Sequence, residues 1–259
     1  MDPLWLVERV FWHLGSAGSI LVAVRLKADR LIGLYSFFFA YLVLSTGRSF
    51  LFWDAAPDTN RYAQIWLFTE PVIWLLHILV AYEIQRRVLR DFPGVASLGR
   101  WVFMAALAAA VVVSSLTLLP DLFSSVKDFP LLQLYNVVRR GVATTLLIFL
   151  LLLSGFLVWF PVPLARNLVI HSLIFTFWSL SVTGSLFVRN MFGPDTAVVV
   201  STALLGFNCV CLASWFFLLN RKGEEVKTVL LHPFRPEMEE QLLGHLAALN
   251  RGLARSLRK

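Results

Sequence analysis

Long runs of apolar residues, separated by short polar breaks, follow one another along the first 220 residues of the chain. Most runs reach the ~20 residues that a helix needs to cross a hydrocarbon core of ~30 Å. The strands of a membrane barrel would instead alternate apolar and polar residues in short segments, and these runs do not alternate. The pattern therefore predicts an all-α membrane protein with several spanning helices.

The runs divide the chain into spans and a tail. The breaks between them contain proline, glycine or clustered charge, which are the usual punctuation between helices. The predicted spans cover residues 4–24, 31–53, 62–83, 100–119, 131–160, 165–188 and 196–220. We therefore expect a polytopic seven-transmembrane-helix bundle formed by residues 1–222, followed by a tail of residues 223–259.

The tail carries a helical stripe of leucines. Pro236 suits the first position of a helix, and the leucines that follow recur every three or four residues, which places them on one face. They are Leu242, Leu246, Leu249, Leu253 and Leu257. The pattern predicts an amphipathic C-terminal helix that packs on its own chain, on a second copy or on a protein partner.

Charge sets the expected orientation. The chain is 58% hydrophobic and 15% charged, below the ~25% charged residues of soluble domains. Most of its 23 Lys and Arg lie in the first, third and fifth breaks and in the tail. Because these residues accumulate on the cytoplasmic side, the N-terminus is expected outside and the C-terminus inside. The net charge of +7 then faces anionic lipid, and no nucleic-acid partner is expected.

Ionisable residues interrupt the apolar runs, mostly near the predicted outer ends. An ionisable group inside a membrane is costly, so it usually faces a partner or water and marks a functional site by default. We therefore predict that these residues bind a ligand in an outward-facing polar cavity. Its surplus positive charge would suit a small anion or a lipid headgroup. The candidate ligand-binding residues are Glu8, Arg9, His13, Arg48, Glu70, His77, Arg139 and Arg140.

Glu70 has the most informative neighbours of these residues. It shares one helix face with His77, two turns away, and Pro71 removes a backbone donor beside it. Glu70 is expected to pair with an outer arginine, for which Arg9, Arg48, Arg139 and Arg140 are the candidates. A dry pair would only fix helix register, whereas a hydrated pair would line a binding cavity. The sequence leaves both interpretations open.

Two local features predict helix packing. The small residues at 15–19 (GSAGS) allow a neighbouring helix to approach closely. Cys209 and Cys211 are two residues apart on one helix and point ~200° apart, so they are unsuited to a mutual disulfide. We interpret both cysteines as small core residues.

Chemistry-bearing motifs are absent from the sequence. It contains no HExxH, no GxSxG and no P-loop, so no enzyme activity is predicted. No cofactor is expected either. The alternative is haem b held between His13 and His77, which the sequence places at comparable depths, because two histidines on facing helices can bind haem iron.

Three stretches carry a resemblance. YSFFFAYLV, IWLFTEPVIWLLHILVAYEIQRRVL and LLGHLAALNRGLARSL are similar to an uncharacterised family of bacterial seven-helix inner-membrane proteins. The shared features are a tyrosine-rich second span, a glutamate in the third span, Tyr82–Glu83 at its inner end and Leu249–Asn250 in the tail. The resemblance implies the same architecture and a place in the bacterial inner membrane, and it brings no activity with it.

These features together predict a receptor-like sensory or accessory module that detects something at its outer cavity. It would act through a cytoplasmic partner, either another protein or a second copy, bound by the C-terminal helix, while lipids surround the spans. One alternative is a small-solute or lipid transporter. Another is a structural or electron-transfer subunit of a larger membrane complex.

Overall fold

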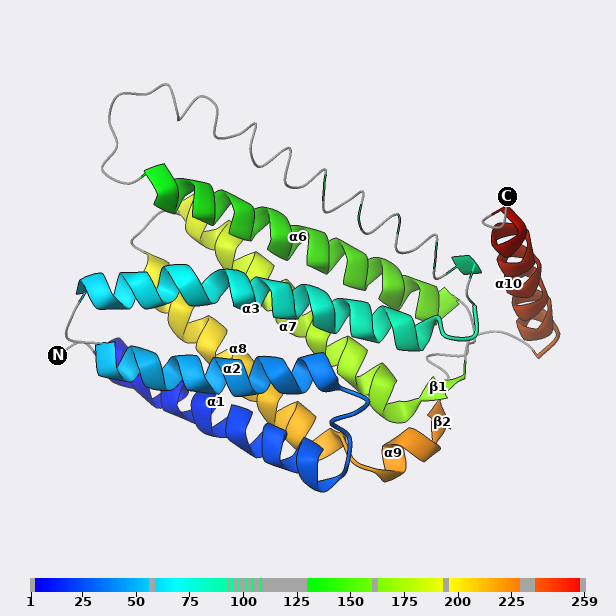
Figure 1. Cartoon of the computed structure of the whole chain (residues 1–259), viewed down its shortest axis with the longest axis horizontal. Helices are drawn as coiled ribbons and strands as arrows, with labels where there is room; N and C mark the ends of the chain where they lie inside the picture. The colour runs from blue at the N-terminus through cyan, green and yellow to red at the C-terminus, as the bar shows by residue number, and fades with distance from the viewer. Residues whose placement is uncertain are drawn as a thin grey trace. The chain divides into compact units, whose positions relative to one another are not determined.

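The structure is a computed structural model, and it describes residues 3–55, 59–92, 130–159, 163–192, 196–228 and 236–256, with isolated positions from 94 to 108. These residues are almost entirely helical, which confirms the all-α prediction (Figure 1). The helices are α1 (Pro3–Ala28), α2 (Ser36–Ala55), α3 (Thr59–Val88), α6 (Pro130–Trp159), α7 (Arg166–Phe192), α8 (Ala197–Leu218), α9 (Lys222–Glu225) and α10 (Pro236–Ser256). The two-residue strands β1 (Leu164–Ala165) and β2 (Lys227–Thr228) pair with each other.

Four of the helices are long and apolar enough to cross a membrane. They are Asn60–Val88 in α3, Val138–Trp159 in α6, Arg166–Arg189 in α7 and Ala197–Leu218 in α8, and they coincide with predicted spans. Helices α1 and α2 match the first two predicted spans in position, but they contain charged residues such as Glu8, Arg9 and Arg48. The predicted span 100–119 lies almost entirely outside the described residues.

The second helix begins later than the sequence predicts. Arg30 has a φ of 58°, a left-handed conformation that is uncommon outside glycine and that does not continue a helix. The next residues form a turn in which the backbone N–H groups of Leu34 and Tyr35 donate to the carbonyl of Leu31. Leu31 and Tyr35 are buried. Leu31 and Tyr35 are therefore buried in a turn that precedes the helix, and they do not belong to it.

The described chain divides into two compact units. The first comprises residues 1–84 and 165–227, and the second comprises residues 85–164 and 228–259. In the first unit α8 packs on both α1 and α7, and α2 packs on α1. Helix α3 continues through Pro71 without interruption. The second unit holds the end of α3, all of α6 and the tail helix α10.

Helices α1 and α8 approach each other closely at the small residues. A Cβ atom on Gly18 would lie 3.3 Å from the side chain of Leu212, a tighter contact than most side chains allow. The predicted packing role of residues 15–19 is therefore confirmed. Cys209 is half-buried and Cys211 is buried, and both are free thiols. The interpretation of the cysteines as core residues is thus confirmed for Cys211.

The tail forms the predicted helix and packs on its own chain. Leu246, in the middle of the leucine stripe, is fully buried, whereas Leu249 is 51% exposed. The side-chain oxygen of Asn250 accepts hydrogen bonds from the backbone N–H groups of Gly94 and Val95, at 2.7 and 3.4 Å. The tail helix therefore packs within the second unit, and part of its leucine stripe stays exposed.

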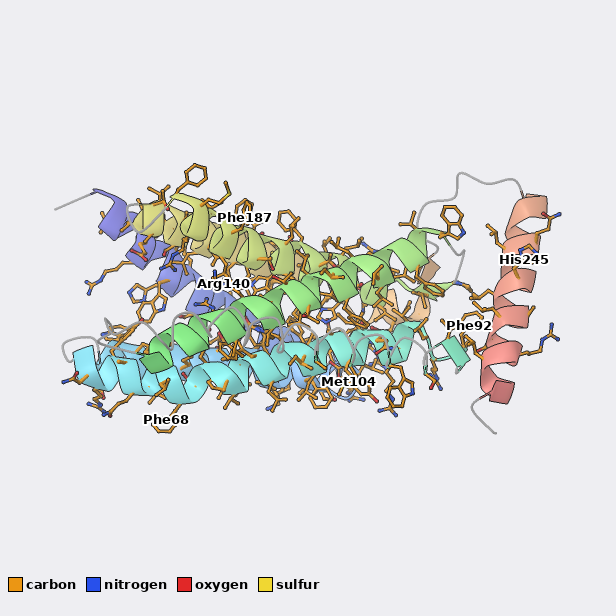
Figure 2. All side chains as sticks on the ribbon, turned by 90° about the horizontal axis from the view of Figure 1, so that it is seen from above. Phe68, Phe92, Met104, Arg140, Phe187 and His245 are labelled. Atoms are coloured by element: carbon orange, nitrogen blue, oxygen red, sulfur yellow. The ribbon has the colours of Figure 1, made fainter. Side chains whose placement is uncertain are left out.

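The first unit is apolar outside and partly polar inside. Phe68 on α3 and Phe187 on α7 are 76% and 63% exposed, and Figure 2 shows both pointing away from their helices. Glu70 and His77 on α3 are buried. Exposed apolar side chains around buried ionisable ones are what helices in lipid are expected to show.

Candidate functional site

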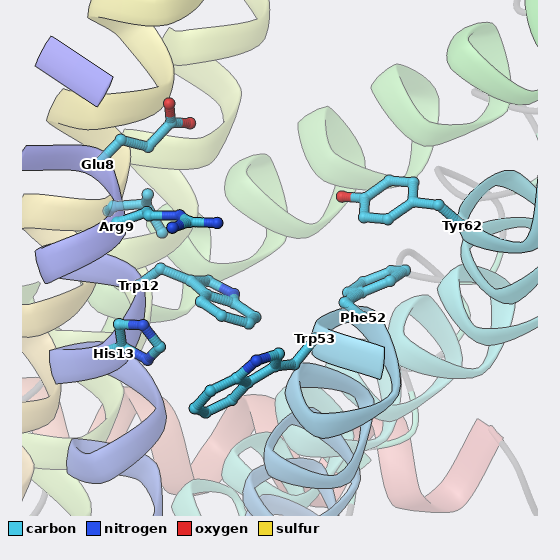
Figure 3. A pocket seen from close by; sticks show the side chains of 8 residues that line it. Glu8, Arg9, Trp12, His13, Phe52, Trp53 and Tyr62 are labelled. Atoms are coloured by element: carbon cyan, nitrogen blue, oxygen red, sulfur yellow. The ribbon is translucent and has the colours of Figure 1, made fainter. Parts of the chain in front are cut away.

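A cavity of about 430 Å³ lies where the start of α1, the end of α2 and the start of α3 meet. Most of the side chains that line it are charged or aromatic, and Figure 3 shows them pointing from three helices into a common space. They are Glu8, Arg9, Trp12 and His13 on α1, Phe52 and Trp53 on α2, Tyr62 on α3, and Leu205 on α8. The volume falls within the range of small-molecule sites.

The helix periodicity explains why these side chains converge. Residues 8, 9, 12 and 13 lie on one face of α1, because positions three and four apart are neighbours on a helix surface. On the opposite wall the Phe52 and Tyr62 rings stack with their centroids 4.5 Å apart. Between the walls His13 meets the Trp53 ring at 5.3 Å, edge to face. Such ring contacts hold aromatic side chains in defined positions.

A smaller cavity of about 180 Å³ adjoins the first and shares Trp12, Phe52 and Leu205 with it. Its remaining lining is mostly small and polar: Gly15, Ser16, Ser19, Ser45, Arg48, Ser49 and Asn208. Its volume would hold about six waters at the ~30 Å³ that a water occupies in the liquid. The polar space therefore continues from the outer cavity into the interior of the first unit.

Arg48 and Glu70 form the expected ion pair beside this smaller cavity. The Arg48 Nη2 and Glu70 Oε2 atoms are 2.5 Å apart, and the side chains are only 15% and 8% exposed. Arg48 lines the smaller cavity and Glu70 does not. The Arg48 Nε–H is buried and donates to no described protein group. One partner of the pair thus borders polar space and the other is enclosed by protein.

His77 lies in an aromatic cluster and not in the cavity. Its ring centroid is 4.7 Å from that of Tyr41 and 4.5 Å from that of Trp178. His13 contacts Trp53, which is twelve residues after Tyr41 on α2, or ~18 Å along the helix axis. The two histidines therefore contact parts of α2 that lie far apart along that helix.

The remaining predicted site residues are Arg139 and Arg140. Both lie on α6 in the second unit and are half-buried. The outer cavity is lined by residues of the first unit alone, and of the predicted set it includes Glu8, Arg9 and His13. Within the described part of the chain no group of three or more His, Cys, Asp and Glu could hold a metal ion.

A second polar cluster lies at the opposite end of the first unit, where α9 follows α8. The Tyr35 hydroxyl donates to Glu224 Oε1 at 2.6 Å. The Asn167 amide donates to the Asn220 carbonyl at 2.6 Å and to Glu224 Oε1 at 3.1 Å. A Cβ atom on Gly223 would overlap the Asn167 amide, so only glycine allows this approach. Helix α9 is therefore held against residues that flank the starts of α2 and α7.

Neither the aromatic lining nor this second polar cluster was predicted from the sequence. Trp12 lies four residues after Glu8, and Phe52 lies four residues after Arg48, so each aromatic ring shares a face with a predicted site residue. That spacing is a usable signal. Asn167 and Glu224 have no such signal, because they are 57 residues apart in the chain.

Comparison of the chain with family models, with characterised proteins and with solved structures gives no significant match.

Proposed function

We propose that this chain is a receptor-like protein of seven transmembrane helices with its N-terminus outside. In this proposal a small ligand binds in the outer cavity, and binding is transmitted to the cytoplasmic end of the first unit. The observation that supports the proposal is a series of side-chain contacts that links the cavity wall to α9.

The outer half of the series contains the buried ion pair. The Phe52 ring of the cavity wall lies 4.9 Å from the Arg48 guanidinium, which pairs with Glu70. Tyr41 lies within electrostatic range of both charges. A ligand that moves Phe52 would therefore change the position of the ion pair.

The inner half of the series is aromatic. The Phe38 ring lies 6.4 Å from the Tyr41 ring and 4.6 Å from the His171 ring. His171 is fully buried and lies 5.1 Å from the ring of Tyr35, whose hydroxyl binds Glu224. From Phe38 to the cavity wall the series follows one face of α2 for ~21 Å. A shift of α2 would therefore act on both ends together.

The packing in the middle of the unit favours transmission over transport. Phe175 is buried between the two histidines, with its ring centroid 6.3 Å from that of His77 and 6.1 Å from that of His171. Phe38 and Trp215, also buried, pack against each other with centroids 4.7 Å apart. These rings fill the region that a solute would have to cross.

The output surface in this proposal is cytoplasmic. The exposed part of the α10 stripe, which includes Leu249, would contact a partner protein or a second copy, since an exposed leucine on an amphipathic helix favours association. Membrane lipids would cover the exposed apolar side chains of the spans.

The coupling can be tested without knowing the ligand. In a variant whose native cysteines are replaced, Trp53→Cys places a thiol in the cavity wall, and a bulky maleimide then fills the cavity. We expect amide hydrogen exchange at residues 220–226 to change at least threefold on labelling, because the contact series would move α9. The matched control is Phe68→Cys, on the exposed side of α3, where the same label should leave these amides unchanged. Unchanged exchange in both labelled variants would refute the proposal.

A further inference from the structure

The walls of the outer cavity bring aromatic faces together. Four of its lining residues, Trp12, Phe52, Trp53 and Tyr62, carry large rings. Aromatic side chains near a membrane surface usually lie among lipid headgroups. Here they line a common cavity, as Figure 3 shows. Rings arranged around a space attract organic cations through their electron-rich faces, and quaternary ammonium groups are the usual guests.

The same cavity holds one acidic and one basic residue. Glu8 and Arg9 are consecutive on α1, so their side chains leave the helix ~100° apart and reach the cavity from different directions. The formal charges of Glu8 and Arg9 cancel. A purely cationic ligand would be repelled by Arg9, and a purely anionic ligand would be repelled by Glu8. A ligand with both charges meets an attractive partner for each.

From these walls and charges we infer that the cavity binds a zwitterion composed of an alkylated ammonium and a phosphate or carboxylate. The inference rests on the proposed function, because it assigns the ligand class of the same cavity. The ammonium is recognised by the tryptophan rings and Glu8. The anion is recognised by Arg9 and by the hydroxyl of Tyr62, since both can donate hydrogen bonds to an oxyanion.

Alkylation of the ammonium follows from the shortage of acceptors. A primary ammonium has three N–H donors, all of which need acceptors once it leaves water. On the lining side chains, acceptors lie only on Glu8, His13 and Tyr62, and the Tyr62 hydroxyl is taken by the anion, so two acceptor side chains remain for three donors. A methylated ammonium needs no acceptor and gains from every ring it touches.

Such a group could belong to a free solute or to a lipid headgroup. Trp53 and Tyr62 are 61% and 44% exposed, so the rim of the cavity is open. An open rim at the end of membrane helices admits either source, and the experiment has to separate them.

The test compares two ligands that differ only in methylation. Glycerophosphocholine and glycerophosphoethanolamine are titrated calorimetrically into the full chain in nanodiscs of phosphatidylglycerol. We expect glycerophosphocholine to bind at least tenfold more tightly than glycerophosphoethanolamine, and also than choline or phosphate alone. Equal binding of the two diesters, or no binding of glycerophosphocholine at millimolar concentration, would overturn the inference.

Variants of the exposed Trp53 connect binding to the cavity. Trp53→Leu removes a ring and should weaken glycerophosphocholine binding about tenfold, whereas Trp53→Phe keeps a ring and should stay within about threefold of the natural chain. Phe68→Leu, on the exposed side of α3, should bind like the natural chain. If Trp53→Leu binds as tightly as the natural chain, the zwitterion does not occupy this cavity.

A change of membrane identifies the source. If a lipid headgroup is the native ligand, nanodiscs of phosphatidylcholine should weaken the apparent affinity for glycerophosphocholine at least tenfold by competition. If the native ligand is a free solute, the affinity should be the same in both membranes. Either result supports the zwitterion class. If no zwitterion of this class binds, the receptor proposal is still tested by the maleimide labelling of Trp53→Cys, because that experiment uses no ligand.

Discussion

Removing each partner of the Arg48–Glu70 pair in turn should have unequal effects on stability. The two side chains are 15% and 8% exposed, so both are largely withdrawn from solvent. Only Arg48 borders the smaller polar cavity. The conservative changes Glu70→Gln and Arg48→Gln keep the shape of each side chain and remove its charge. Comparing the stability of the two variants shows which charge the protein tolerates better when the opposite charge is removed.

Glu70→Gln leaves the guanidinium of Arg48 beside a cavity of about 180 Å³. That space would hold about six waters, and the hydroxyls of Ser45 and Ser49 line it. Because the orphaned charge can be hydrated there, the loss should approach that of an exposed ion pair. We expect the free energy of unfolding to fall by about 1 kcal/mol.

Arg48→Gln leaves the carboxylate of Glu70 enclosed by protein and outside the cavity lining. Breaking a buried pair by removing one partner typically costs about 3–5 kcal/mol, because the remaining charge loses its ion-pair partner inside the protein. The double variant removes both charges, so it should recover most of the loss seen in Arg48→Gln. It should recover little of the smaller loss seen in Glu70→Gln.

The assay is reversible unfolding of the purified protein by SDS in mixed micelles, followed by circular dichroism. The four proteins form a double-mutant cycle, which isolates the interaction between the two residues. Equal losses in the two single variants, both restored in the double variant, would show that the pair is equally dry on both sides. In that case the smaller cavity does not hydrate the Arg48 charge, and the ion pair only fixes the register of the helices.

Three further predictions concern orientation, cofactor and tail. Cysteine introduced at the exposed Asn60 should be labelled from outside intact cells, and cysteine at Glu225 only after permeabilisation; the opposite pattern would reverse the proposed orientation. The purified protein should show no Soret band that depends on His13 and His77, because their contacts on α2 lie ~18 Å apart; a stoichiometric band lost in His13→Ala or His77→Ala would contradict that distance. Asn250→Ala should cost about 1 kcal/mol, the typical net contribution of an intramolecular hydrogen bond. It should speed exchange of the amides at 94 and 95, and unchanged exchange would mean that the two hydrogen bonds hold nothing in place.

Most helix positions could be predicted because apolar runs and their polar breaks have an unambiguous spacing. The described helices that correspond to predicted spans end within a few residues of the expected positions. The start of α2 is the exception. Leu31 and Tyr35 are as apolar as a span, and the left-handed backbone at Arg30 that turns the chain has no signature in residue type.

The candidate site was predictable only residue by residue. The cost of a charge in a membrane marked Glu8, Arg9, Arg48 and Glu70 individually, and it also suggested the pair between the last two. The relative positions of His13 and His77 along the helices were not predictable, because they depend on how far each helix extends beyond its apolar run. The aromatic walls were missed because tryptophans near span ends are ordinary at a membrane surface.

The packing of α1 on α8 has a consequence for how the chain is made. The thiol of Cys209 on α8 donates to the carbonyl of Phe11 on α1 across 198 residues of sequence. At ordinary rates of synthesis, about 5–20 residues per second, α1 waits roughly 10–40 s before α8 emerges from the ribosome. During that interval the face around Gly18 has no α8 to cover it, and Glu8 and Arg9 lie in a helix less apolar than its later neighbours. Until α8 is made, α2 is the described helix that can pack on α1, so chains stalled before α8 leave the face around Gly18 uncovered.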